Sequence, residues 1–398
     1  MAKIDDSVKK KVPELRFPGF TDDWEERKLA DFIDVKSGKD YKHLNSGSIP
    51  VYGTGGYMLS VDRALSDIDA IGIGRKGTID KPYLLKAPFW TVDTLFYAVP
   101  KQNIDLQFSL SIFKKINWKK FDESTGVPSL SKTVINSVGA SVPSYEEQQK
   151  IGSFFQQLDE TIALHQRKLD LLKEQKKGYL QKMFPKNGAK VPELRFAGFA
   201  DAWEDRKFFE SIASTIDFRG RTPKKLGMDW SESGYLALSA LNVKNGYIDP
   251  LADAHYGDEN LYKKWMSGKE LKKGQVLFTT EAPMGNVAQV PDNNGYILSQ
   301  RTVAFETKED MMTNDFLAVL LKSPLVFNNL SALSSGGTAK GVSQKSLKGL
   351  SITVPFDIDE QQKIGSFFKQ LDDTIALHQR KLDLLKEQKK GFLQKMFV

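Results

Sequence analysis

Two stretches of the chain carry apolar residues at alternating spacings of four and three, the pattern of a helix with a single apolar seam. They lie within residues 146–184 and 359–397. Neither stretch contains proline, the intervening residues favour helix, and Ser144 before an acidic first turn is a suitable N-terminal cap for the first one. The pattern predicts two long helices, and Pro185 ends the first.

The apolar seam of each helix persists for more than four heptads. The seam positions are Ile151, Phe155, Leu158, Ile162, His165, Leu169, Leu172, Lys176, Tyr179 and Met183 in the first helix, and Ile364, Phe368, Leu371, Ile375, His378, Leu382, Leu385, Lys389, Phe392 and Met396 in the second. A lone helix would leave this stripe in water, so we expect the two helices to pair within one molecule. The alternative is that each helix packs on its own domain.

The segments between the helices have a different pattern, with short apolar runs broken by Gly and Pro that predict strands joined by turns. Predicted strands lie in residues 66–99, 234–248 and 274–306, and predicted helices in residues 106–117 and 314–330. We therefore expect two α+β domains rich in sheet.

Two internal repeats organise these elements. Residues 12–29 return as residues 191–208 with 13 of 18 positions identical, and residues 146–184 return as residues 359–397 with 35 of 39 identical. The segments between them show only scattered similarity. The order is thus short repeat, unlike domain, long helix, twice over.

The composition excludes some classes of protein but does not by itself indicate a function. The 398 residues include no Cys, which rules out disulfide scaffolds and Cys-based metal sites, and the net charge of +7 permits a polyanionic partner without requiring one. Residues 1–20 lack the apolar core of an export signal. We expect a cytoplasmic protein that does not span a membrane.

No catalytic or metal site can be defended from the sequence. Residues 72–77 fit G-x-G-x-x-G, but Pro82 and Pro88 continue an extended pattern where a dinucleotide site needs a helix. The four histidines, at positions 43, 165, 255 and 378, form no cluster with ligand spacing. We predict no catalytic residue, no metal and no cofactor in this chain.

Basic loops are better candidates for function, because cations and backbone N–H groups can contact phosphates or base edges. The candidate DNA-binding residues are Arg75, Lys76, Gly77 and Thr78 in one turn, and Arg219, Arg221, Thr222, Lys224 and Lys225 in one loop. Lys114, Lys115, Lys119 and Lys120 are interpreted instead as a solvated helix face. Trp24 and Trp203 are expected to pack the domains onto the helices.

Together these residues resemble the specificity subunits of type I restriction-modification systems. The resemblance rests on the duplicated block P-x-L-R-F-x-G-F-x-x-x-W, which begins at Pro13 and at Pro192, and on E-Q-Q-K-I-G-S-F-F-x-Q-L-D, which begins at Glu147 and at Glu360, each followed by the duplicated helix. Lesser similarities are the stretch from Ile73 to Thr78 and, in the second domain, Val276 to Thr279 and Ser299 to Arg301.

The resemblance implies two target-recognition domains that each read one half of a split, asymmetric DNA site. It also implies that the long helices form an antiparallel intramolecular coiled coil with pseudo-two-fold symmetry. The predicted segments are residues 1–145 for the first short repeat and recognition domain, 146–184 for the central helix, 185–190 for a linker, 191–358 for the second repeat and domain, and 359–398 for the last helix. The helix-pair interface is predicted at Phe155, Leu158, Ile162, His165, Leu169, Leu172, Phe368, Leu371, Ile375, His378, Leu382 and Leu385.

The same resemblance implies partners that supply the chemistry. Double-stranded DNA, two modification subunits and the restriction subunits are the expected partners, and these subunits are expected to bind S-adenosylmethionine, ATP and Mg. Two alternatives remain open: a self-contained enzyme that acts on DNA through an unrecognised site, and a helical scaffold whose domains bind proteins.

Overall fold

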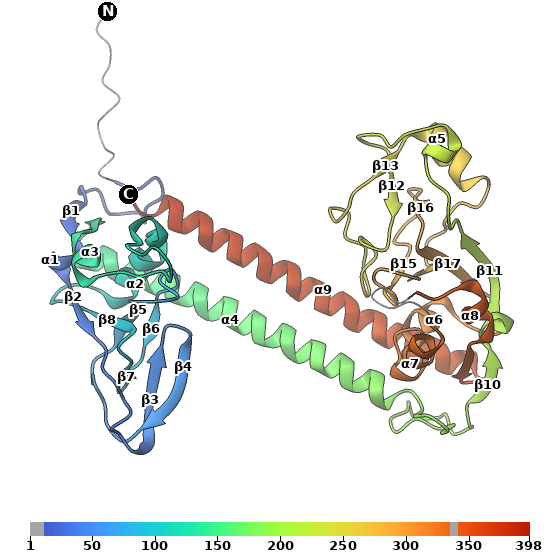
Figure 1. The fold of residues 1–398 in the computed structure, drawn as a ribbon, viewed down its shortest axis with the longest axis horizontal. Coiled ribbons are helices and arrows are strands. Elements are labelled where there is room, and N and C mark those ends of the chain that lie inside the picture. The colour runs from blue at the N-terminus through green and yellow to red at the C-terminus, as the bar shows by residue number, and fades with distance from the viewer. Residues whose placement is uncertain (1–11, 335–340) are drawn as a thin grey trace, which may run out of the picture. The chain divides into compact units, whose positions relative to one another are not determined.

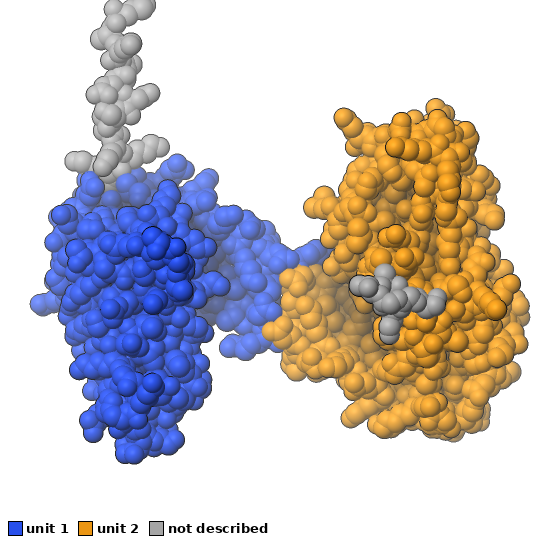
Figure 2. All heavy atoms as spheres, viewed as in Figure 1, with its two compact units in different colours: residues 1–167, 380–398 blue, residues 168–379 orange. Residues whose placement is uncertain are grey.

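The computed structural model describes residues 12–334 and 341–398, so the first 11 residues of the predicted N-terminal segment lie outside it. The chain forms two compact units (Figure 2). Unit 1 comprises residues 1–167 and 380–398, and unit 2 comprises residues 168–379. Each unit therefore contains part of both long helices.

Unit 1 is built on a four-stranded antiparallel sheet with strand order β2-β8-β5-β6 and a three-stranded sheet with order β4-β3-β7 (Figure 1). A third, two-stranded sheet pairs β1 with β9. The elements are β1 (Glu25–Lys28), α1 (Leu29–Phe32), β2 (Ile33–Ser37), β3 (Ser46–Gly53), β4 (Gly56–Val61), β5 (Ala70–Gly74), β6 (Tyr83–Leu85), β7 (Trp90–Thr91), β8 (Leu95–Pro100), α2 (Leu106–Lys115), the 3-10 helix η1 (Trp118–Phe121), α3 (Lys132–Ser137), β9 (Gly139–Val142) and α4 (Tyr145–Lys182).

Unit 2 repeats this plan. Its sheets have the orders β11-β17-β14-β15, β13-β12-β16 and β10-β18. The elements are β10 (Glu204–Lys207), the 3-10 helix η2 (Phe208–Ser211), β11 (Ile212–Asp217), the 3-10 helix η3 (Lys224–Leu226), β12 (Tyr235–Leu238), β13 (Tyr256–Gly257), α5 (Glu259–Met266), β14 (Val276–Thr279), β15 (Val287–Gln289), β16 (Ile297–Leu298), β17 (Thr302–Thr307), α6 (Asn314–Leu320), α7 (Pro324–Leu333), α8 (Gln344–Gly349), β18 (Ser351–Val354) and α9 (Ile358–Lys395). The predicted α+β class is confirmed.

The helix expected over residues 314–330 is two helices. Pro324 occupies the first turn of α7 and cannot donate the hydrogen bond that would continue α6. Across residues 12–334 and 341–398, no single helix is long and apolar enough to cross a membrane, and α6 and α7 reach that apolar content only as a pair bent by 67°.

The long helices run antiparallel within each unit. In unit 1, Phe154 near the start of α4 contacts Phe392 near the end of α9, with ring centroids 5.0 Å apart. In unit 2, Tyr179 near the end of α4 contacts Phe367 near the start of α9 at the same distance. The predicted helix pair is confirmed, and the Ser144 hydroxyl caps α4 by accepting the Glu147 N–H at 3.4 Å.

The twelve predicted interface residues lie on the buried side of these helices. Phe155, Leu169, Leu172, Phe368, Leu382 and Leu385 are buried, whereas Leu158, Ile162, His165, Leu371, Ile375 and His378 are half-buried. Leu164, Leu171, Leu377 and Leu384, which the spacing places off the seam, are exposed. The alternative packing also occurs, since Phe155 and Phe368 belong to the cores of units 1 and 2.

An aromatic cluster joins each short repeat to the helix ends. In unit 1, Trp24 contacts Phe108 of α2 and Phe397 just after α9, with ring centroids 6.0 and 6.1 Å apart. In unit 2, Trp203 contacts Phe316 of α6 and Phe184 just after α4, at 6.1 and 5.8 Å. The expectation that both tryptophans pack the domains onto the helices is therefore confirmed.

Candidate nucleic-acid interface

The turn after β5 opens onto a groove of about 490 Å³ in unit 1. Its lining combines three cations, Arg75, Lys76 and Lys132, with the carboxylate of Glu123 and with small polar residues. Phe96 and Leu130 also line the groove, so it combines apolar with polar surface, and its lining cations outnumber its carboxylate. Two candidate residues from the sequence, Arg75 and Lys76, lie in it, and both are exposed.

Backbone hydrogen bonds fix the shape of this groove. The Arg75 N–H donates to the Thr94 carbonyl at 2.8 Å, and the Leu130 N–H donates to the Arg75 carbonyl at 2.9 Å. Lys76 and Ser129 form an antiparallel bridge. We call this arrangement the groove frame, because it sets where side chains project without depending on which side chains they are.

Unit 2 contains the same frame around a groove of about 470 Å³. The Thr280 N–H donates to the Arg301 carbonyl at 2.8 Å, the Val342 N–H donates to the Thr280 carbonyl at 2.9 Å, and Glu281 and Gly341 form the antiparallel bridge. Position 280 thus corresponds to position 75, position 281 to position 76, and position 301 to position 94.

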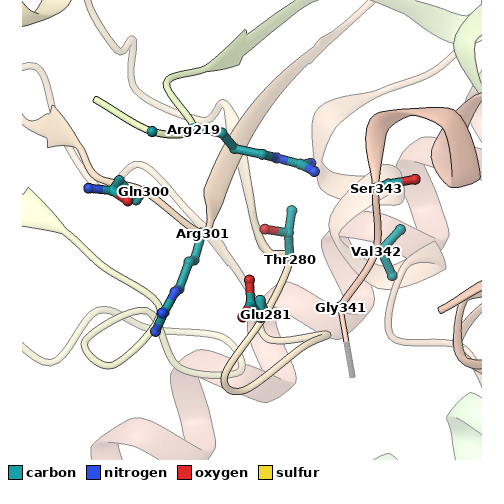
Figure 3. Close-up of a pocket in the computed structure, with 9 residues that line it drawn as sticks. Arg219, Thr280, Glu281, Gln300, Arg301, Gly341, Val342 and Ser343 are labelled. Atoms are coloured by element: carbon teal, nitrogen blue, oxygen red, sulfur yellow. The ribbon is translucent and has the colours of Figure 1, made fainter. Parts of the chain in front are cut away.

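The side chains on the two frames differ. In unit 2 the cations are Arg219 and Arg301, and the carboxylate is Glu281. Figure 3 shows the Arg219 side chain extending toward Val342 and Ser343, while the Arg301 side chain extends away from Arg219. Arg219 also forms an ion pair with Asp217 at 3.0 Å.

The remaining sequence candidates in unit 1 support the groove rather than line it. Gly77 has a φ of 96°, a left-handed conformation that favours glycine, and its N–H donates to the Pro128 carbonyl at 2.8 Å. Thr78 is half-buried beside it. Residues 75–82 contain no helix, in agreement with the extended pattern predicted there.

The basic loop of unit 2 is divided between the groove and a second role. Arg219 lines the groove, whereas the Arg221 guanidinium donates to the Trp265 carbonyl and lies 4.2 Å from the centroid of the Phe218 ring. Thr222 accepts the Lys225 N–H through its hydroxyl, and the side chains of Lys224 and Lys225 are exposed. Arg221 therefore holds the loop together.

We expect Arg221→Ala to lower the stability of unit 2 by about 2 kcal/mol, because the variant loses a charged hydrogen bond and the contact with the Phe218 ring. Hydrogen exchange of the α5 amides measures this loss. Lys224→Ala, in the same loop but exposed, is the matched control and should change stability by less than about 0.5 kcal/mol. Equal losses of stability in the two variants would show that Arg221 has no special structural role.

Sequence reasoning missed several residues that line the grooves: Lys132, Glu281, Arg301 and Ser343. In the sequence, Ser299 to Arg301 stand out only as part of the family resemblance. Lys114, interpreted as solvated, instead donates to Asp159 of α4 at 2.8 Å. For Lys114 the interpretation is wrong because the partner lies on an element distant in sequence, whereas Lys115, Lys119 and Lys120 are exposed.

A family model described as the type I restriction modification DNA specificity domain matches residues 21–174 and, again, residues 212–387. The chain belongs to this family. Specificity subunits of type I systems are not the catalytic components, and the chain is accordingly assigned no enzymatic activity of its own.

Individual members of the specificity family are distant in sequence. The specificity subunit of the type I restriction enzyme MjaVIII from Methanocaldococcus jannaschii is 22% identical over 334 residues, which cover 82% of this chain and 75% of the relative. The HindI specificity subunit from Haemophilus influenzae is 28% identical over 134 residues, 33% of this chain and 29% of the relative.

The crystal structure of a type I restriction-modification S subunit from M. genitalium has the same fold. It superimposes with a TM-score of 0.70 at 13% identity and covers 97% of this chain and 99% of that one. The duplicated plan of recognition domain and long helix is thus the fold of this specificity family.

Proposed function

We propose that the chain reads a bipartite, asymmetric DNA target, with unit 1 and unit 2 each contacting one half-site. The observation that carries this proposal is the occurrence of the same groove frame in both units within otherwise unlike segments. Equivalent frames present two DNA-binding surfaces of one kind. Unlike segments around the frames require unlike half-sites, since different base edges need different donors and acceptors.

The rest of the two units supports asymmetry. In unit 1, β3 and β4 are joined by a tight turn at Thr54 and Gly55, whereas in unit 2 the corresponding strands β12 and β13 are separated by residues 239–255. Unit 2 also adds α5 before β14. Two domains with one topology and unlike insertions are suited to read different sequences.

The proposed partners follow from the same assignment. We propose that the helix pair scaffolds two modification subunits and, through them, the restriction subunits. S-adenosylmethionine, ATP and Mg then belong to those partners. A DNA target inside the cell places the protein in the cytoplasm.

Exchange of one recognition segment is the decisive experiment. We expect replacement of residues 33–100 by the counterpart from a related specificity subunit with a different target to change one half-site and leave the other unchanged. This segment runs from β2 to β8 and leaves α2 native, so the contacts of Phe108 with Phe397 and of Lys114 with Asp159 of α4 are kept. Mapping of methylated adenines in cells that carry the complete system measures the outcome.

A change in both half-sites, or in neither, would contradict the modular assignment. The two rivals give different results. A self-contained enzyme would methylate or cleave DNA as the purified single chain, supplied with S-adenosylmethionine, ATP and Mg. A protein-binding scaffold would leave the methylated sequence independent of residues 33–100.

A further inference from the structure

At one hydrogen-bonded pair of the groove frame, an arginine and a threonine exchange places between the two units. In unit 1, Arg75 donates its backbone N–H to the carbonyl of Thr94, and in unit 2 Thr280 donates to the carbonyl of Arg301. These are the same two frame positions with the residue types transposed. Each unit has one arginine in this hydrogen-bonded pair, as the donor residue in unit 1 and as the acceptor residue in unit 2.

Both grooves also have more cations than carboxylates in their lining. At the bridge position, unit 1 has Lys76 and unit 2 has Glu281. Three lining cations accompany Glu123 in unit 1, and Arg219 and Arg301 accompany Glu281 in unit 2, where Arg219 also pairs with Asp217. The lining cations thus outnumber the lining carboxylates in both grooves, although the cations stand at different frame positions.

This pattern distinguishes two kinds of DNA contact. What a base-reading residue recognises depends on its position, because donors and acceptors on base edges occupy fixed places in the groove of DNA. A phosphate contact requires a cation or a polar donor near the strand, and it carries no sequence information directly. Two half-sites of different sequence have one component in common, the sugar–phosphate backbone.

We infer that the two equivalent grooves bind the phosphate backbone of each half-site and that they do not read bases. The inference rests on the proposed DNA-reading function and extends it. Beside one glutamate each and a few apolar residues, the side chains that line the grooves are lysine, arginine, serine, threonine and glutamine, types that commonly contact phosphate oxygens. Base reading belongs to segments outside the frame.

The backbone at Arg301 adopts a strained conformation. Its φ is 65°, in the left-handed region that non-glycine residues rarely adopt. Glycine would relieve that strain, and the carbonyl that accepts the Thr280 N–H would remain. Arg301→Gly therefore removes the cation without endangering the fold.

The test uses the full chain assembled with its modification subunits. Two duplex probes are needed, one with the methylated site mapped for the native system and one of unrelated sequence. For Arg301→Gly we expect affinity for both probes to fall alike, on the order of tenfold, and the slope of log affinity against log salt to decrease by about one. The methylated sequence should not change.

A double variant sharpens the test by moving the cation. Thr280→Arg combined with Arg301→Gly places the arginine of unit 2 at the frame position that Arg75 occupies in unit 1. A phosphate contact predicts recovery of most of the lost affinity and of the salt slope, again with an unchanged methylated sequence. Ser267→Gly, which relieves a φ of 50° at the end of α5, is the matched control and should leave affinity unchanged.

Three outcomes overturn the inference. A relaxed or altered half-site in Arg301→Gly would make the residue a base reader, unchanged affinity and salt slope would remove it from the interface, and failure of the double variant to recover affinity would show that position matters. The proposed function fails separately, if the native complex methylates no split sequence or binds both probes equally.

Discussion

Asp372→Asn is expected to lower the stability of unit 2 by about 3 kcal/mol, the range found when a largely buried ion pair loses one partner. The Asp372 carboxylate accepts hydrogen bonds from Lys176 of α4 and, at 3.3 Å, from Lys322 after α6. The side chains of Lys176 and Lys322 are only 16% and 11% exposed. Asparagine would leave two ammonium groups facing each other with little access to water.

The difference in stability between the native protein and Asp372→Asn should shrink as pH rises. Burial lowers the pKa of Lys322, and the Asp372 carboxylate partly opposes that shift. A lysine whose folded pKa lies below its unfolded value of 10.5 releases its proton first in the folded state, so stability increases as pH rises through that window. Without Asp372 the folded pKa falls further. The stability of the variant therefore begins to rise at a lower pH than that of the native protein.

Hydrogen exchange of the α6 amides in the full chain measures this loss, and the α2 amides of unit 1 serve as the internal reference, since a chain of two units need not unfold in one step. Asp373→Asn is the matched control, because Asp373 is the adjacent residue of α9 and is exposed. An equal loss at position 373, or a deficit that grows between pH 7 and pH 9.5, would count against the buried ion pair as the cause.

Arg195→Met is expected to have an effect of similar size, about 3–4 kcal/mol in unit 2. Arg195 donates two hydrogen bonds to Glu360, at 2.6 and 2.7 Å, and the Glu360 side chain is fully buried. Removing the guanidinium leaves a carboxylate with neither water nor a cation. The same pairing of Arg16 with Glu147 in unit 1 predicts the same loss there for Arg16→Met.

The double variant Arg195→Met with Glu360→Met identifies the mechanism. If the loss arises from the uncompensated charge, replacing both partners by apolar side chains should recover most of the stability. Lys190→Met removes an exposed cation paired with Asp205 and should cost less than about 0.5 kcal/mol. Denaturation followed by exchange in α9 measures all three, and no recovery in the double variant would assign the effect to packing.

Spacing alone was enough to predict the helix pair. Leu169 and Leu171 are the same residue type two positions apart, yet the first is 1% exposed and the second 52%. Only the heptad register separates them, and it can be read from the sequence because 38 residues repeat one geometric rule. Burial of Trp24 and Trp203 was predictable for the related reason that large aromatic side chains in a repeated block need a common place to pack.

The groove frame could not be predicted, because main-chain hydrogen bonds hold it. Such bonds accept almost any side chain, so Arg75 and Thr280 occupy one position without any similarity that a sequence comparison would register. The duplication of sheet order between the two units was missed for the same reason. The composition of a loop also does not predict the role of each residue. Arg221 and Lys224 are cations three residues apart, but Arg221 donates to a buried carbonyl whereas Lys224 is exposed.

Unit 1 combines residues from both ends of the chain, and this has a consequence for biosynthesis. The core of unit 1 includes Met396 and Phe397, and Trp24 packs directly on Phe397. At roughly 5–20 residues per second, the ribosome needs roughly 10 to 40 s to proceed from Phe184 to Phe397. Throughout that interval the nascent unit 1 presents Trp24, Phe108 and Phe155 without their final partner. A chaperone that binds exposed aromatic surface therefore has its longest opportunity on the half of the protein that is made first.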